Sequence, residues 1–175
     1  MQAAAIFTIQ LVLGYAAWAL AFGSYIWPGL RSMDAARAHR AIATLHSFRF
    51  FGLIFILPGI VGPQVPSGFG VPAAWGDLAT AVLAMLALAC FRTRPLFWAF
   101  IVAFNIVGSL DLAVAYFDAV RLHLPEASGQ LGPAYLVPIL YVPVLVMTHG
   151  AAFALMMRSL QGAHVAAAGR AAGRG

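Results

Sequence analysis

Apolar residues fall into five long runs, which are separated by short polar or Gly/Pro-rich links. About 20 residues of helix, rising about 1.5 Å each, cross the roughly 30 Å hydrocarbon layer of a bilayer. The runs therefore predict an all-α bundle of five transmembrane helices, at about residues 3–30, 41–62, 73–91, 96–120 and 134–157. They form one domain, residues 1–160, and the Ala/Gly/Arg-rich segment 161–175 is predicted to be disordered.

Composition points to the same class of protein. Hydrophobic residues make up 63% of the 175 residues and charged residues only 9%. A soluble domain carries about 25% charged residues to cover its surface, so this surface is expected to face lipid. The net charge is +5 and all ten cations are arginines, which lie between the apolar runs rather than on one basic face. The expected partner is the bilayer, and nucleic acid is not expected.

The arginines are divided unequally between the two ends of the predicted bundle. One end receives the first link, the third link and the C-terminal segment, and it holds eight arginines: Arg31, Arg37, Arg40, Arg92, Arg94, Arg158, Arg170 and Arg174. The other end holds only Arg121. Cytoplasmic links of membrane proteins are rich in arginine and lysine. The count therefore predicts an external N-terminus and a cytoplasmic C-terminus.

Six of the polar residues inside the predicted spans are the main candidate site residues, because ionisable groups are costly there and mark functional sites. Counting from the outer helix ends places three of them in one layer of the cytoplasmic half: His46, Asn105 and His149. Arg49 and Asp111 lie slightly further outward, where they can approach each other. Asp77 is predicted only four residues into its helix, where a carboxylate suits the positive end of the helix dipole.

Arg49 has three interpretations. Its side chain can snorkel to the headgroups, because the link after its helix carries no charge. It can instead pair with Asp111, because an unpaired charge is expensive in lipid. It can also clamp an anionic group of a ligand. The structural interpretations are favoured over the functional one, since ion pairs between membrane helices often serve packing alone.

The two intramembrane histidines support more specific hypotheses about ligand binding. His46 and His149 at equal depth can each bond to a neighbouring helix, or can serve together as axial ligands of a b-type haem with Arg49 holding a propionate. A quinone or a metal is a further ligand for such a pair. A catalytic metal site is not expected, because no third ligand clearly joins this layer. Pro138 and Pro143 interrupt the fifth helix and free carbonyls that need partners.

The polar positions belong to a wider pattern. The second helix reads His46-Ser-Phe-Arg49-Phe, the third carries Trp-Gly-Asp77, the fourth Asn105 and Asp111, and the fifth Thr-His149-Gly. Over roughly residues 25–157 the chain resembles a group of uncharacterised bacterial multi-pass membrane proteins with a His-x-Phe-Arg-Phe second helix. The resemblance implies a location in the bacterial inner membrane and carries no activity.

Three classes of function remain open. The first, which we favour, is binding of a lipophilic ligand or redox cofactor (haem or quinone) through His46, His149, Arg49 and Asn105. The second is a proton-linked or small-solute transporter that uses Asp111, Arg49 and the histidines, which at this size would need a homo-oligomer. The third is a non-catalytic accessory subunit of a larger membrane complex. No nucleophile–base pair can be assigned, so no enzymatic reaction is predicted.

Overall fold

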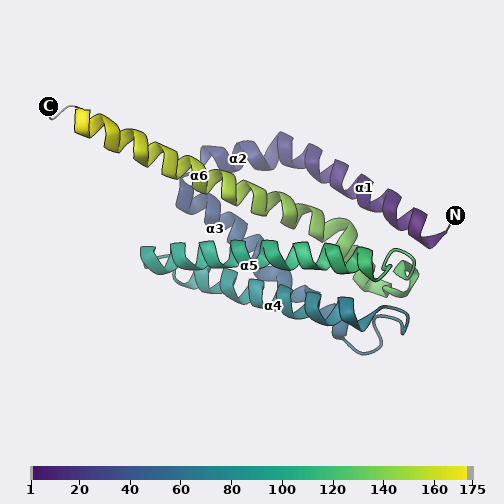
Figure 1. Cartoon of the computed structure of the whole chain (residues 1–175). Coiled ribbons are helices and arrows are strands. Elements are labelled where there is room, and N and C mark those ends of the chain that lie inside the picture. Colours follow the sequence, from purple (N-terminus) through teal and green to yellow (C-terminus); the bar gives the residue numbers. More distant parts are fainter. Residues whose placement is uncertain (1, 173–175) are drawn as a thin grey trace.

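The computed structural model describes the backbone of residues 2–172, with the side chains of residues 2–159 and Gln161. This part of the chain is helical without strands, and its long helices pack side by side (Figure 1). Four helices are long and apolar enough to cross a membrane: Ala3–Ser32, Ser67–Ala89, Arg94–Arg121 and Gly132–Ser159. The all-α class is confirmed for the described residues, and four of the five predicted spans are membrane-type helices; the predicted second span, 41–62, is not among the four.

The first segment lies on the outside of the bundle. It consists of α1 (Ala3–Ala21), a π-helical turn (Phe22–Ile26) and α2 (Trp27–Ser32). It packs against the start of the last segment, where Gly14 lies directly against the carbonyl of Ile139 and Trp18 Nε1 donates to the carbonyl oxygen of Leu140 at 2.7 Å. The indole of Trp18, which lies in mid-span, therefore serves one of the carbonyls in the proline-interrupted stretch.

The second segment differs from the prediction. It begins with α3 (Ala35–His46), which Asp34 caps by accepting from Arg37 N at 3.0 Å, and continues as a 3₁₀-helix (Ser47–Ile56). It ends at Ile56 rather than at residue 62, because the residue before a proline is pushed into extended conformation, and Leu57 before Pro58 has ψ 122°. A 3₁₀-helix rises about 2.0 Å per residue, so the tighter winding partly offsets the earlier end.

The third segment also begins elsewhere than expected. Helix α4 (Ser67–Ala89) starts six residues before the predicted position and includes Pro72 in its interior. Proline lacks the N–H that would bond to Gly68, and a helix tolerates that loss close to its own start, where few bonds are affected. Asp77 therefore lies ten residues into α4 instead of four, and the predicted role as a helix-end cap is wrong.

The remaining segments follow the prediction more closely. Helix α5 (Arg94–Arg121) follows a tight turn after α4. Short 3₁₀ turns (Ser128–Gln130 and Gly132–Tyr135) and a π-helical turn (Val137–Tyr141) lead into α6 (Val142–Ala172). Helix α6 thus continues through residues 161–172, most of the segment expected to be disordered, and residues 173–175 of that segment lie outside the described part.

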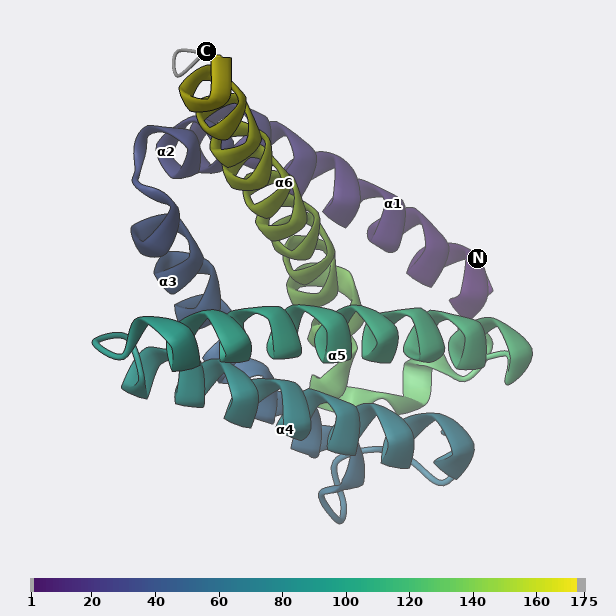
Figure 2. The ribbon, with the colours of Figure 1, turned by 60° about the vertical axis from the view of Figure 1, so that its left-hand side comes forward.

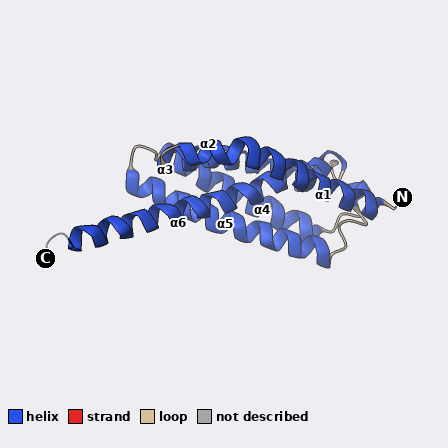
Figure 3. Ribbon diagram, turned by 90° about the horizontal axis from the view of Figure 1, so that it is seen from above, coloured by secondary structure: helices blue, strands red, loops and turns tan. Residues whose placement is uncertain are grey.

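The ends of the segments alternate. The α2–α3 link, the α4–α5 turn and the C-terminal end of α6 lie at one end of the bundle, and the N-terminus lies at the other (Figures 1 and 3). Figure 2 shows α1 leaning away from α5 and α4. Two apolar clusters fill the interior, one near each end, around Phe97, Ile101 and Phe104 and around Phe55, Phe69 and Leu124. Most of the buried polar residues lie between these two clusters along the helices: His46, Arg49, Asp77, Thr80, Asn105, Thr148 and His149.

Candidate functional site

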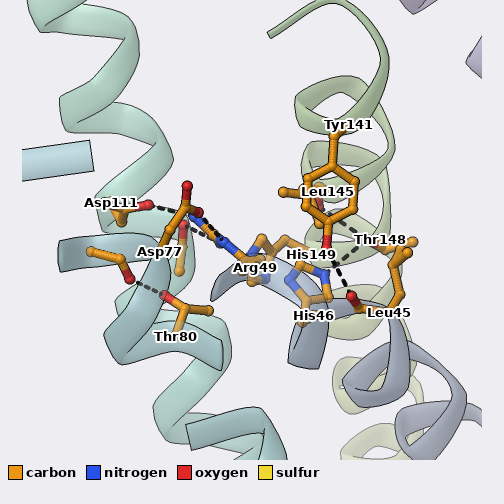
Figure 4. A network of polar contacts seen from close by, with 12 residues as sticks. Leu45, His46, Arg49, Asp77, Thr80, Asp111, Tyr141, Leu145, Thr148 and His149 are labelled. Atoms are coloured by element: carbon orange, nitrogen blue, oxygen red, sulfur yellow. Dashed lines mark hydrogen bonds and ion pairs between the residues drawn. The ribbon is translucent and has the colours of Figure 1, made fainter. Parts of the chain in front are cut away.

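A single guanidinium forms the centre of the polar layer. Arg49, on the 3₁₀-helix, is fully buried, with 0% of its side chain exposed (Figure 4). Its Nε donates to Oδ1 of Asp77 on α4 at 2.6 Å, and its Nη2 donates to Oδ2 of Asp111 on α5. The predicted pair with Asp111 is confirmed, and snorkelling to the headgroups is wrong. Asp77 is a second carboxylate partner that the sequence did not assign to Arg49.

The remaining donors of Arg49 reach two further groups. Nη1 lies 3.3 Å from the carbonyl oxygen of Gly108 on α5 and 3.2 Å from Nε2 of His149 on α6. One side chain therefore links the 3₁₀-helix to α4, α5 and α6. Because a buried charge is tolerated only when it is paired and hydrogen-bonded, this arrangement specifies how the four segments pack.

Three glycines make room for this cluster. A Cβ on Gly52 would collide with the carboxylate of Asp77, and a Cβ on Gly76 would collide with that of Asp111. A Cβ on Gly108 would lie 2.7 Å from Arg49 Nη1 and 2.7 Å from His149 Nε2. The side chains of the Arg49 cluster thus occupy the space that any residue larger than glycine would need at these three positions.

His149 has a defined tautomer. A guanidinium only donates hydrogen bonds, so Nε2 of His149 accepts from Arg49 and carries no proton. Its Nδ1 lies 2.9 Å from Oδ1 of Asn105 and donates to it, while Nδ2 of Asn105 donates to the carbonyl oxygen of Ile101 at 2.8 Å. Both ring nitrogens are therefore used, and the imidazole is neutral.

His46 lies against the same ring but bonds elsewhere. Its Nε2 is 2.9 Å from the hydroxyl of Thr148, which itself donates to the carbonyl oxygen of Val144 at 2.7 Å. The hydroxyl therefore accepts from His46, so Nε2 carries the proton and Nδ1 does not. Nδ1 is buried without a partner in the described part of the chain.

A haem does not fit between the two histidines. Their ring centroids are 4.2 Å apart, and each Nε2 is already engaged, one by Thr148 and one by Arg49. An iron with two axial imidazoles needs a free nitrogen lone pair from each ring and a porphyrin plane between them. The rings contact each other directly, so the geometry does not accommodate His46 and His149 as a pair of axial ligands.

A cavity of about 350 Å³ adjoins the cluster, between α1, α5 and α6. Its wall includes the ring of His149 and the side chains of Tyr15, Ser109, Tyr116 and Phe153. The hydroxyls of Tyr15 on α1 and Tyr116 on α5 hydrogen-bond across it at 2.5 Å. Oγ of Ser109 is buried with no partner among the described residues. The Tyr15–Tyr116 bond uses one tyrosine proton, so the second proton of the pair and that of Ser109 are left to donate to a group bound beside them.

A second hollow, of about 120 Å³, lies beside the first. Leu112 and Tyr116 line both, while Phe7, Leu11 and Phe69 line only the second. Its exposed lining is wholly apolar. Together the two form a crevice between α1 and α5, which we call the α1–α5 crevice, with hydroxyls in one part and hydrocarbon in the other.

The predicted site residues come together, but they do not all face the crevice. His46, Arg49, Asp77, Asn105, Asp111 and His149 form one connected cluster, and among them His149 alone lines the larger cavity. The sequence analysis missed Tyr15, Ser109 and Tyr116 as site residues. Ser109 and Tyr116 are seven residues apart on α5, hence on one helical face, and a mid-span tyrosine needs a partner for its hydroxyl.

Residues 6–157 match a family model described as Domain of unknown function (DUF8737). No curated protein and no solved structure matches the chain.

Proposed function

We propose a function from the site itself, because the chain belongs to the DUF8737 family and the description of that family gives no activity. The protein is an integral protein of the bacterial inner membrane with five spans, an external N-terminus and a cytoplasmic C-terminus. It binds a quinone-type lipid in the α1–α5 crevice. The observation that carries this proposal is a mainly apolar cavity bordered by Tyr15, Ser109 and Tyr116, next to a wholly apolar hollow.

The chemistry of the cavity favours a neutral head group. Arg49 is fully buried and keeps its donors for Asp77, Asp111, Gly108 and His149, so it does not present charge to the crevice. Two donors remain there: the hydroxyl of Ser109, and the one proton of the Tyr15–Tyr116 pair that does not serve their mutual bond. A quinone ring has carbonyl oxygens that accept such bonds, whereas a phosphate would need cations.

The shape of the crevice fits a head with a tail. A cavity of about 350 Å³ lies within the usual range for small-molecule sites, roughly 300–1,000 Å³. The apolar hollow beyond Leu112 and Tyr116 can take the first part of an isoprenoid chain. Of the four membrane-type helices, Ala3–Ser32 is the least buried: only 11% of the residues in its apolar stretch are buried. This leaves a lateral route from the lipid into the crevice.

In this proposal the Arg49 cluster positions the wall of the site. Arg49 and Asn105 hold the His149 ring from its two nitrogens, so the ring presents a fixed surface to the cavity. His149 then contacts the ligand through its carbon edge, since neither nitrogen is free. His46, Asp77 and Asp111 act further back, by fixing the helices that carry the wall.

Thermal unfolding of the purified protein with decylubiquinone tests the proposal. A ligand at 100 times its dissociation constant stabilises the folded state by about 2.7 kcal/mol. Ser109→Ala should weaken binding by roughly 2- to 12-fold, the equivalent of one net hydrogen bond. Ser47→Ala, at a serine that lies outside the crevice and whose hydroxyl donates to the carbonyl oxygen of Thr44 in α3, should bind normally.

A blocking variant completes the test. Ala113 is exposed on α5 and lines the cavity, so Ala113→Phe should fill the cavity without disturbing the core. Binding should then be lost while the unfolding temperature without ligand stays close to that of the natural chain. No stabilisation of the natural chain, or equal stabilisation of Ala113→Phe, contradicts quinone binding in the crevice.

One observation favours the proton-linked transporter as a second candidate. Two carboxylates, Asp77 and Asp111, share the one guanidinium of Arg49, so the cluster has one formal negative charge more than it has positive. One proton would neutralise it. Proton uptake into liposomes that contain the protein and a pH-sensitive dye tests this candidate, and uptake that survives Asp111→Asn argues against it.

A further inference from the structure

At the arginine-rich end of the bundle, two arginines flank a separate hollow of about 580 Å³. Arg40 comes from α3, and Arg92 from the turn between α4 and α5, while Leu88, Ala89 and Phe91 complete the lining. This hollow shares no lining residue with the α1–α5 crevice. It combines two cations with an apolar floor at the end of two membrane-type helices.

Both cations are without an anionic partner. Within the described residues, neither Arg40 nor Arg92 has a carboxylate within ion-pair distance, whereas Arg37 pairs with Asp34 and Arg121 pairs with Asp118. Uncompensated cations that converge on one hollow favour a bound anion. Guanidinium groups suit phosphate in particular, because their paired N–H donors match its oxygens.

The site is partly organised in advance. Cζ of Arg40 lies 4.6 Å from the ring centroid of Phe91, a cation–π contact that holds the side chain beside the hollow. Helix α5 begins in the same turn, and the side chain of Thr93 does not cap it, so the positive end of its dipole adds to the field there. Less ordering is then needed when an anion binds.

We propose that Arg40 and Arg92 bind the phosphate of an anionic phospholipid, with Leu88 and Ala89 against its glycerol and upper acyl chain. The apolar floor distinguishes this occupant from free phosphate, which has nothing to place there. Basic pockets at the cytoplasmic ends of membrane helices are an established mode of lipid headgroup recognition. The proposal is independent of quinone binding in the α1–α5 crevice.

Native mass spectrometry of the purified protein in a neutral detergent tests this site. Titration with phosphatidylglycerol and with phosphatidylcholine of the same acyl chains should show preferential binding of the anionic lipid. Arg40→Gln and Arg92→Gln should each weaken it by roughly fivefold, the effect expected of one arginine near a lipid phosphate. Arg40→Lys keeps the charge but not the paired N–H donors, so it should bind more tightly than Arg40→Gln and less tightly than the natural chain, which separates loss of the site from loss of the fold.

Two controls give the result its meaning. Arg158 is exposed on α6, is not part of the hollow, and carries the same charge, so Arg158→Gln should leave the tight binding unchanged. Inorganic phosphate at millimolar concentration should not displace the lipid. Equal losses from Arg158→Gln and Arg40→Gln would mean diffuse attraction only, and would overturn the proposal. Equal binding of phosphatidylcholine, or full displacement by phosphate, would also overturn it.

Discussion

Nη1 of Arg49 lies 3.2 Å from Nε2 of His149, and this contact determines what the histidine can do. Because the guanidinium can only donate, the ring nitrogen that faces it has to accept. The other nitrogen donates to Asn105 at 2.9 Å. His149 is thereby held as a neutral ring with no free lone pair, which suits the wall of a binding site better than it suits a metal ligand.

Nitrogen-15 NMR of the imidazoles tests this assignment. His149 should show a protonated Nδ1 and an unprotonated Nε2, whereas His46, which donates from Nε2 to Thr148, should show the opposite tautomer. Asn105→Leu should remove the acceptor of His149 and lower the free energy of unfolding by about 1–3 kcal/mol, the cost of an unsatisfied buried donor. Identical tautomers at the two histidines would refute the network as drawn.

Replacing Arg49 should strongly destabilise the folded protein. Arg49→Leu leaves Asp77 and Asp111 buried without their cation, and we expect a loss of about 3–5 kcal/mol in the free energy of unfolding. Arg121→Leu is the matched control, because its side chain is 57% exposed and its pair with Asp118 is worth about 0–1 kcal/mol. Denaturant unfolding in mixed micelles measures both. Similar effects from the two variants would show that the buried cluster does not organise the bundle.

The glycine that faces the cluster offers a steric test. Gly108→Ala would place a methyl group 2.7 Å from Arg49 Nη1 and from His149 Nε2, and should cost about 1–3 kcal/mol. Gly150→Ala, on α6, meets no atom within 4 Å and should be neutral or slightly stabilising, since alanine favours helix over glycine. Thermal unfolding separates the two, and a neutral Gly108→Ala would mean that the three segments are not packed this closely.

The hydroxyl contact across the crevice gives a fourth stability test. Tyr15→Phe and Tyr116→Phe each remove the bond that joins α1 to α5, and each should cost about 0.5–1.5 kcal/mol. The double variant should cost no more than either single one, because only one interaction is lost. Tyr25→Phe, at a residue that is 79% exposed, is the control. Strictly additive losses would show that the two hydroxyls do not bond to each other.

Depth counting from the sequence located much of the polar cluster. Span positions followed from the apolar runs, and counting residues from the span ends placed Arg49 near Asp111 and put His46, Asn105 and His149 at one level. The structure agrees, because Arg49 bonds to Asp111 and the two histidine rings lie 4.2 Å apart. Such counting works because helix rise converts sequence position into depth.

Depth counting is wrong where a helix starts at another residue than predicted or is wound as a 3₁₀-helix. The predicted span begins at residue 73, directly after Pro72, but Pro72 lies inside α4, so the count puts Asp77 at a helix start instead of beside Arg49. The 3₁₀ winding of residues Ser47–Ile56 also has no clear signal in the apolar pattern. The crevice could not be predicted from the sequence, for another reason. The tilt of α1 depends on packing at Gly14 and Trp18, and not on hydropathy.

Photoaffinity labelling tests quinone binding in the crevice most directly. An azido-quinone with an isoprenoid tail is photolysed with the protein in nanodiscs, and the labelled peptides are mapped by mass spectrometry. Binding in the crevice predicts label on α1 and on α5 around Ser109 and Tyr116, lost with excess decylubiquinone and in Ala113→Phe. Label spread over lipid-facing residues such as Met85 and Met157, and unchanged by competitor or by Ala113→Phe, would contradict it.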